Sequence, residues 1–271
     1  MYETFYGLKE NPFEITPNPQ YLFLGKNHRE ALARMRYGIQ ERKGFILITG
    51  EVGTGKTILI RHLVGNLDGS KNADVKTVLI FNPKLTANDF LYYILRELAV
   101  TIRGNSKGDH LRDLNEYLLK ANERGEKVVL IVDEAQGLKP ALLEEIRLLS
   151  NLETPKTKLL QIILVGQPEL RNTLCRREFR QLRQRINLHF HLLPLSEEQT
   201  RAYIEKRITI AGGKDPLFAT EAVQEIYRRT KGVPRLINIL CDNALLAGFA
   251  ADQKIIDEKL IKDAADDLEL S

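Results

Sequence analysis

The sequence of 271 residues predicts an α/β fold, in which helices cover both faces of a parallel sheet and a smaller domain of helices follows. Short, almost wholly apolar segments alternate with amphipathic helical patterns up to residue 194, as expected for strands that are buried on both faces. From residue 195 onward only helical patterns remain. We therefore predict an α/β domain at 1–194 and a helical domain at 195–271.

The chain opens with a segment that is rich in proline and aromatic residues, from Tyr6 to Leu24. This composition favours an extended stretch pinned to a folded surface, and we expect it to wrap the α/β domain. A helix is expected from about 27 to 40. No apolar run approaches the about 18 residues that cross a membrane, and the first residues lack the pattern of a secretory signal. We therefore expect a cytoplasmic protein without a membrane span.

The first strand, which begins near Phe45, runs directly into a glycine-rich turn and a helix, and the turn fits G-x-x-x-x-G-K-T. Glycines let successive backbone N–H groups turn toward phosphate oxygens, and the helix presents its positive dipole end to the same anion. Lys56 suits the β- and γ-phosphates, and the Thr57 hydroxyl suits Mg2+. The motif predicts a site for a nucleoside triphosphate with Mg2+, made by Gly50, Glu51, Val52, Gly53, Thr54, Gly55, Lys56 and Thr57.

A second strand is expected at 75–81, followed by helices at 88–100 and 111–122. The third strand, 127–132, is continuously apolar after its first residue and ends at Asp133 and Glu134. Because ligands of open α/β sheets bind at the carboxyl ends of the strands, these acids are expected beside the nucleotide. Asp133 suits the Mg2+ water shell, and Glu134 suits the polarisation of a water for attack on the γ-phosphate.

A helix at 139–151 and a fourth strand at 159–165 come next, and Gln167 follows that strand. We expect Gln167 to hydrogen-bond the attacking water or the γ-phosphate. An arginine-rich helix then leads to a fifth strand at 187–191. Residues 171–185 contain six arginines and one acid, whereas residues 252–269 contain seven acids and three lysines. This asymmetry is typical of partner surfaces, and two solvated helix faces of opposite sign explain it equally well.

The C-terminal part predicts helices at 197–211, 220–230, 234–250 and 257–268, with Ser196 and Thr220 as N-caps. Between the second and third of them lies Gly232-Val233-Pro234-Arg235. Arg235 is expected in the first turn of a helix, where a cation is electrostatically unfavourable unless a nearby anion neutralises it. We interpret that anion as the γ-phosphate.

These motifs, in this order, resemble those of AAA+ ATPases. The segments Tyr6-Gly7-Leu8 to Phe13, Val165 to Leu170 and Leu182-Arg183-Gln184-Arg185-Ile186 are similar more narrowly to the general secretion pathway protein A (ExeA-like) family. The resemblance implies a sheet of order 5-1-4-3-2, ATP as the nucleotide, Lys56 and Thr57 as Walker A, and Asp133 and Glu134 as Walker B. It also implies Gln167 as sensor 1, Arg235 as sensor 2, and an arginine finger among Arg183 to Arg185.

The resemblance further implies hydrolysis between subunits of a homo-oligomer, ring or filament, that assembles or remodels a protein partner complex of the secretion pathway. A similar ATPase domain occurs in regulators of DNA transposition that assemble on duplex DNA, so a DNA-bound oligomer is the alternative. A small-molecule P-loop kinase fits less well, because it has little use for Glu134 as a water activator. As the finger we favour Arg185 over Arg183, and the alternative is that both pair with Glu178 or other surface acids.

Overall fold

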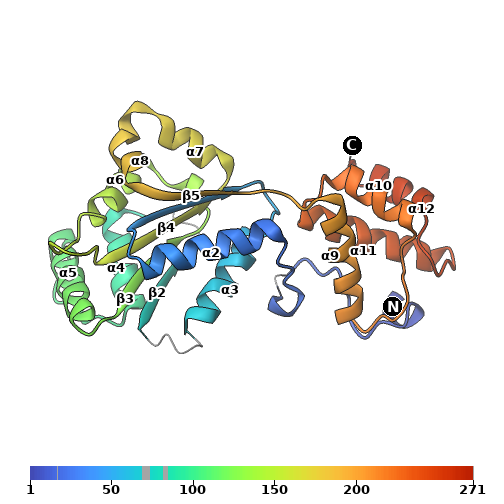
Figure 1. The fold of residues 1–271 in the computed structure, drawn as a ribbon, viewed down its shortest axis with the longest axis horizontal. Coiled ribbons are helices and arrows are strands. Elements are labelled where there is room, and N and C mark those ends of the chain that lie inside the picture. Colours follow the sequence, from blue (N-terminus) through green and yellow to red (C-terminus); the bar gives the residue numbers. More distant parts are fainter. Residues whose placement is uncertain (17, 69–73, 82–84, 271) are drawn as a thin grey trace. The chain divides into compact units, whose positions relative to one another are not determined.

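The computed structural model describes residues 1–16, 18–68, 74–81 and 85–270. It divides the chain into two compact units. The α/β unit consists of His28–Glu51 and Leu59–Leu192, and the helical unit consists of Met1–Asn27, Val52–Ile58 and Leu193–Ser271 (Figure 1). The helices in the described part of the chain include none that is long and apolar enough to cross a membrane.

The α/β unit is built on one sheet of five strands in the order β2-β3-β4-β1-β5, and every pair is parallel. This order confirms the prediction. All five strands therefore end at the same edge of the sheet, where Thr49 lies opposite Gly166 and Val132 lies opposite Leu164. The strands are β1 Phe45–Gly50, β2 Val75–Ile80, β3 Lys127–Val132, β4 Leu160–Gly166 and β5 Ile186–Leu192.

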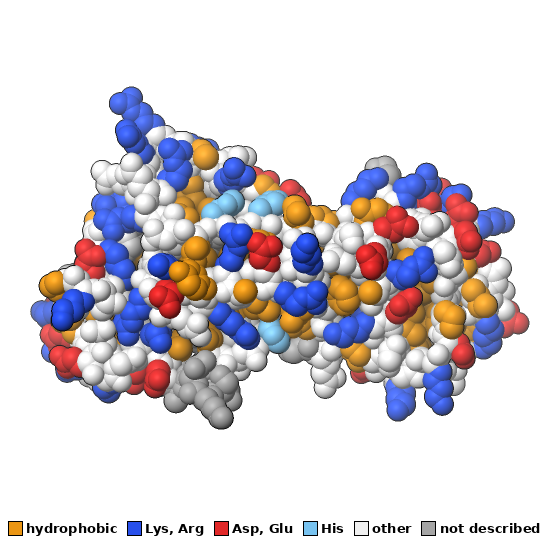
Figure 2. All heavy atoms as spheres, in the orientation of Figure 1, with side chains coloured by type: hydrophobic (Ala, Val, Ile, Leu, Met, Phe, Trp, Pro, Cys, Tyr) orange, Lys and Arg blue, Asp and Glu red, His pale blue; other side chains and the backbone are white. Residues whose placement is uncertain are grey.

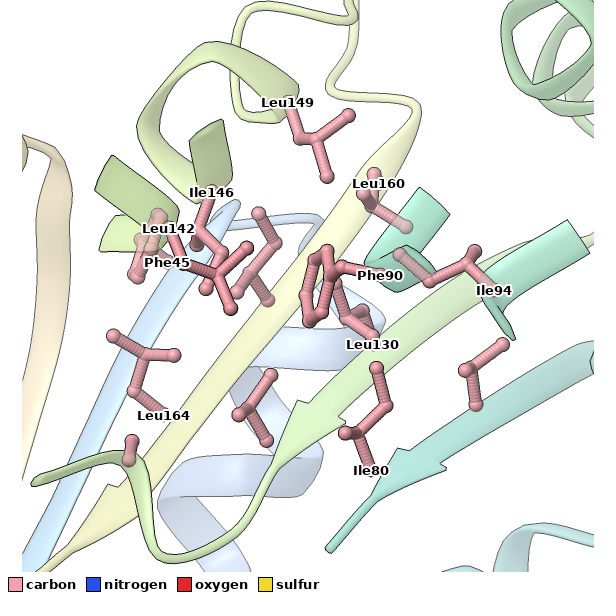
Figure 3. Close-up of a cluster of buried hydrophobic side chains, with 14 of the residues drawn as sticks. Phe45, Ile80, Phe90, Ile94, Leu130, Leu142, Ile146, Leu149, Leu160 and Leu164 are labelled. Atoms are coloured by element: carbon pink, nitrogen blue, oxygen red, sulfur yellow. The ribbon is translucent and has the colours of Figure 1, made fainter. Parts of the chain in front are cut away.

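Helices cover both faces of this sheet. On one face Leu130 and Leu164 pack against Phe90 of α4 and Ile146 of α6 (Figure 3). On the other face α2 approaches so closely that a Cβ on Gly38 would lie 2.5 Å from Ile46 Cδ1. The helices that lie wholly or mostly in this unit are α2 Lys26–Gln40, α3 Lys56–Asp68, α4 Ala87–Glu97, α5 Lys107–Glu123, α6 Pro140–Leu149, α7 Pro168–Cys175 and α8 Arg180–Arg185.

The arginine-rich segment differs from the single helix that we expected. Arg176 adopts extended backbone angles, φ −63° and ψ 151°, and so ends α7. A 3-10 turn, Arg177–Phe179, then leads into α8, with the side chains of Phe179 and Leu182 buried in the core. The buried side chains of Leu174 and Phe179 are five residues apart, about 140° around a straight helix, and the break between them lets both reach the core.

The helical unit contains the four predicted helices, α9 Glu197–Ile210, α10 Thr220–Thr230, α11 Pro234–Ala250 and α12 Glu258–Asp267. Ser196 caps α9 as expected, in a capping box with Gln199. Thr220 is not a cap, because it is already the first residue of α10 and Ala219 holds the N-cap position.

The opening segment, with the short α1 Tyr2–Phe5 and the 3-10 turn Pro19–Tyr21, belongs to this helical unit and not to the α/β domain where we placed it. The Tyr6 hydroxyl donates to the carbonyl oxygens of α11 and of the turn after it. Arg207 of α9 is buried, donates to the Pro12 carbonyl and lies 4.6 Å from the Tyr21 ring. Buried aromatic rings and a buried arginine thus fasten the segment across the helices.

Candidate nucleotide site

The glycine-rich turn connects β1 to α3, and its backbone has the conformation that a phosphate loop needs. Gly53 and Gly55 have φ values of 81° and 94°, which residues with a Cβ rarely adopt. Lys56 is the first residue of α3 and is only 6% exposed, an unusual burial for lysine. The loop therefore brings the N-terminus of a 13-residue helix and a buried cation together.

The Gly232 to Arg235 motif lies directly against this loop, within the helical unit. The Arg235 N–H donates to the Gly53 carbonyl at 3.3 Å. A Cβ on Gly53 would lie 2.7 Å from Arg235 Cβ and 3.0 Å from Val233 Cγ1, so this close approach requires glycine. Pro234 occupies the first turn of α11. The structure thus places Arg235, the predicted sensor, beside the phosphate loop.

Gly232 holds the motif in place from the other side. Its φ is 74°, and a Cβ there would lie 1.9 Å from the Leu195 carbonyl oxygen. The Leu195 N–H donates to the Gly232 carbonyl at 2.9 Å. The orientation of Arg235 therefore depends on a backbone contact that only glycine allows.

The two acids follow β3 at the carboxyl edge of the sheet, in the α/β unit. Asp133 is buried and accepts the Glu134 N–H at 2.8 Å. Glu134 is exposed and left-handed, with φ 53° and ψ 36°. The other non-glycine residues with positive φ in the described chain each follow the end of a helix, whereas Glu134 follows a strand. Strained backbone of this kind is common at functional sites.

The sheet also brings Gln167, which follows β4, close to Glu134. Gln167 Nε2 lies 3.4 Å from Glu134 Oε2. A third side chain, Gln136, joins them, because it donates to Glu134 Oε2 and accepts the Gln167 N–H at 3.0 Å. Sequence reasoning missed Gln136. The available signal was a long amide side chain in the turn directly after the two acids.

Arg183 and Arg185 lie in α8, just before the edge strand β5. Arg183 is exposed and reaches the Cys175 carbonyl at 3.5 Å, whereas Arg185 is half-buried and reaches the Ser150 carbonyl at 3.5 Å. Neither forms an ion pair with Glu178 or another acid in the described part of the chain.

Residues 39–174, half of the chain, match the family model of the AAA domain. The chain belongs to the AAA domain family. This AAA protein is a P-loop ATPase. It is 46% identical over 251 residues to General secretion pathway protein A of Aeromonas hydrophila, so the predicted resemblance is confirmed. The match covers 92% of the chain and 45% of that relative, so the chain spans less than half of the relative's length.

Two solved structures support the fold of the AAA protein. The ORC2 protein of Aeropyrum pernix, in its ADPNP-ADP complexes, has a TM-score of 0.69 at 18% identity, covering 95% of this chain and 71% of that chain. The ORC1 protein of Aeropyrum pernix, in complex with DNA, has a TM-score of 0.68 at 17% identity, covering 96% and 70%. At such identities the likeness extends to the fold alone.

The contact between Gly53 and Arg235 gives a testable prediction. Gly53→Ala should cost about 1 kcal/mol of backbone strain and should also push Val233 and Arg235 away from the loop. We expect roughly a tenfold or larger loss of affinity for a fluorescent ATP analogue, equal to about 1.4 kcal/mol or more. The matched control is Gly125→Ala, because Gly125 has φ 78° with no atom within 4 Å of the added Cβ. Equal affinities of the two variants would contradict this account of the site.

Proposed function

We propose that the AAA protein binds ATP with Mg2+, hydrolyses it between the subunits of a homo-oligomer, and uses the cycle to assemble or remodel a protein complex of the secretion-pathway type. The observation that carries this proposal is the contact of the Arg235 motif with the phosphate loop. It is supported by the polar side chains of Asp133, Glu134 and Gln167 at the ends of β3 and β4. The relative from Aeromonas hydrophila supports the type of complex. Because the reaction consumes ATP, we place the protein in the cytoplasm.

The residues present fit a metal-nucleotide complex. The positive φ of Gly53 and Gly55 is the conformation that turns loop N–H groups toward an anion, and buried Asp133 is a hard oxygen ligand beside the strand end. Thr57 and Asp133 would hold Mg2+, which neutralises charge on the β- and γ-phosphates. Gly50 to Thr57 bind the phosphates through backbone N–H groups and Lys56, and the Arg235 guanidinium pairs with the γ-phosphate.

Glu134 acts as the general base in this proposal. Its carboxylate takes a proton from the attacking water, and the Gln167 amide orients that water or the γ-phosphate. The arrangement supports these roles, because Gln167 Nε2 already lies within reach of the Glu134 carboxylate.

A trans-acting arginine completes the site. Among the described residues β5 pairs with β1 alone, so β5 is an edge strand, and the arginines before it lie near the edge where a second subunit would approach. Residues two apart in a helix face nearly opposite directions, so one of Arg183 and Arg185 can point to that subunit. Arg183 is the better candidate in the structure, because it is exposed while Arg185 is half-buried. This reverses the preference drawn from the sequence.

A DNA-bound oligomer is the second candidate function. It is favoured by the arginines of the α7 to α8 segment, because Arg176, Arg177 and Arg180 are exposed and none forms an ion pair within the described residues. Figure 2 shows basic side chains gathered over this part of the α/β unit. Arginine clusters of this kind suit phosphate recognition.

Two single variants test the assigned roles. Glu134→Gln should retain ATP binding and lose most turnover, because an amide cannot take the proton of the water. Lys56→Ala should lose affinity as well, because it removes a charge from the phosphates. A fluorescent-ATP titration and a steady-state ATPase assay separate the two effects. Equal loss of nucleotide binding in both variants would refute the assignment.

A mixing experiment tests the trans-acting arginine. Arg183→Ala should lower turnover on the order of a thousandfold, since such a finger stabilises charge on the leaving γ-phosphate. Mixed with inactive Lys56→Ala, it should recover activity, because its intact nucleotide site can meet the arginine of the other subunit. Arg185→Ala is the paired control and should not complement in this way. Strictly additive activity at all ratios, with a monomeric mass in the presence of ATP analogue, would reject the proposal.

The DNA candidate is tested by titrating duplex DNA into the protein with a nonhydrolysable ATP analogue at several salt concentrations. Replacing Arg176, Arg177 and Arg180 by Gln should weaken binding and flatten the salt slope by roughly one unit per lost phosphate contact. ATP binding should not change.

A control variant removes the same net charge elsewhere. Its three cations already pair with acids, so their loss should affect DNA binding little; they are Arg34 with Glu30, Arg112 with Asp109 and Lys262 with Glu258. Equal weakening by both triple variants would show that overall charge alone drives association. Absence of duplex binding by the unmodified protein at low salt would exclude this candidate.

A further inference from the structure

Gln136 lies in the turn after Glu134, the proposed general base. Both the nitrogen and the oxygen of its side-chain amide form hydrogen bonds. Its Nε2 donates to Glu134 Oε2, two residues earlier in the chain. Its Oε1 accepts the backbone N–H of Gln167, 31 residues later, at 3.0 Å. The amide therefore links the end of β3 to the end of β4.

The orientation of this amide is fixed by chemistry. A backbone N–H is a donor only, so the Gln136 atom that faces Gln167 N must be the oxygen. The NH2 group must then face the Glu134 carboxylate, which when ionised is an acceptor only. Reversing the amide would oppose donor to donor at one end and acceptor to acceptor at the other.

The surrounding backbone also holds Gln136 close to Glu134 and to the end of β4. Glu134 is left-handed, and the 3-10 turn Ala135–Gly137 brings Gln136 back toward it. A Cβ on Gly166 would lie 2.8 Å from Gln136 Oε1 and 3.3 Å from Gln136 N, so β4 approaches the turn closely at a residue without a side chain.

The contacts leave the two oxygens of Glu134 in different situations. Oε2 accepts hydrogen bonds from Gln136 and Gln167, whereas Oε1 accepts none within the described residues. An exposed glutamate has several rotamers. Two donors to Oε2 select a rotamer in which Oε1 is left to accept a hydrogen bond from water. A base that is held in this way meets the attacking water in one geometry.

We propose that Gln136 is a positioning residue for ATP hydrolysis, which holds Glu134 Oε2 and Gln167 together so that Glu134 Oε1 faces the attacking water. This inference rests on the proposed role of Glu134 as the general base. Gln136 does not itself contact the reacting atoms.

Two variants distinguish positioning of Glu134 from bracing, by which we mean that Gln136 only stabilises the link between the ends of β3 and β4. In Gln136→Glu an oxygen can still accept the Gln167 N–H, but the donor to Glu134 is replaced by a carboxylate that repels it. In Gln136→Met both hydrogen bonds are lost at similar side-chain length. Positioning predicts that both variants lose turnover, roughly 10- to 100-fold, as part of the effect of a general base. Bracing alone predicts that Gln136→Glu remains active and that only Gln136→Met is impaired.

The measurements are kcat for ATP hydrolysis, the Kd of a fluorescent ATP analogue, and the midpoint of thermal unfolding. We expect kcat to fall in both variants while the Kd stays that of the unmodified protein. The matched control is Gln161→Met, at the amino end of β4. The Gln161 amide makes a similar bridge, since it accepts the Gly44 N–H at 2.8 Å and donates to the Lys158 carbonyl at 3.2 Å. This control should lower the unfolding midpoint and leave kcat of the folded protein unchanged.

An unchanged kcat in Gln136→Glu would overturn the inference, and so would an equal loss of kcat in Gln161→Met. Glu134→Gln is assayed beside them. If Glu134→Gln still turns over, the proposed base itself is wrong. If Glu134→Gln is inactive while Gln136→Glu is active, the role of Gln136 alone is refuted.

Discussion

Parallel pairing of the five strands is the constraint on which the candidate site depends. Because the strands run in one direction, their carboxyl ends meet at one edge, and the register puts Thr49 of β1 opposite Gly166 of β4. The central strands are buried along their length, so a shift by one residue would disturb close packing against the helices on both faces. Burial thus fixes the register, and the register fixes where Asp133 and Gln167 emerge.

At this edge and in the phosphate loop the backbone has positive φ values, at no steric cost for Gly53 but with strain for Glu134. Gly53 combines a positive φ with a contact of its carbonyl to Arg235, and Glu134 adopts a left-handed conformation that a residue with a Cβ rarely takes. Such conformations persist when the surroundings hold them. Here the 3-10 turn, the Gln136 amide and buried Asp133 hold Glu134.

The sequence predicted the parts of the fold that depend on local patterns. Apolar runs that end at Gly50, Asp133 and Gln167 located the strand ends, and family resemblance supplied the strand order. The partner of the opening segment was not predictable, because its contact between Arg207 and Pro12 joins residues 195 positions apart without a local signal. The break in the arginine-rich helix accompanies the burial of Phe179, a tertiary contact that the local sequence pattern does not reveal.

The arginine-rich segment gives both candidate functions a common physical basis. Five positive charges in excess over fifteen residues repel one another, and none of these arginines forms an ion pair within the described chain. The guanidinium group is planar and matches phosphate oxygens in pairs, which an ammonium group cannot do. The break at Arg176 and the turn into α8 separate Arg183 from Arg176 and Arg177. In the two proposals, Arg183 of α8 would meet a γ-phosphate of a neighbouring subunit, and Arg176, Arg177 and Arg180 would meet a nucleic-acid backbone.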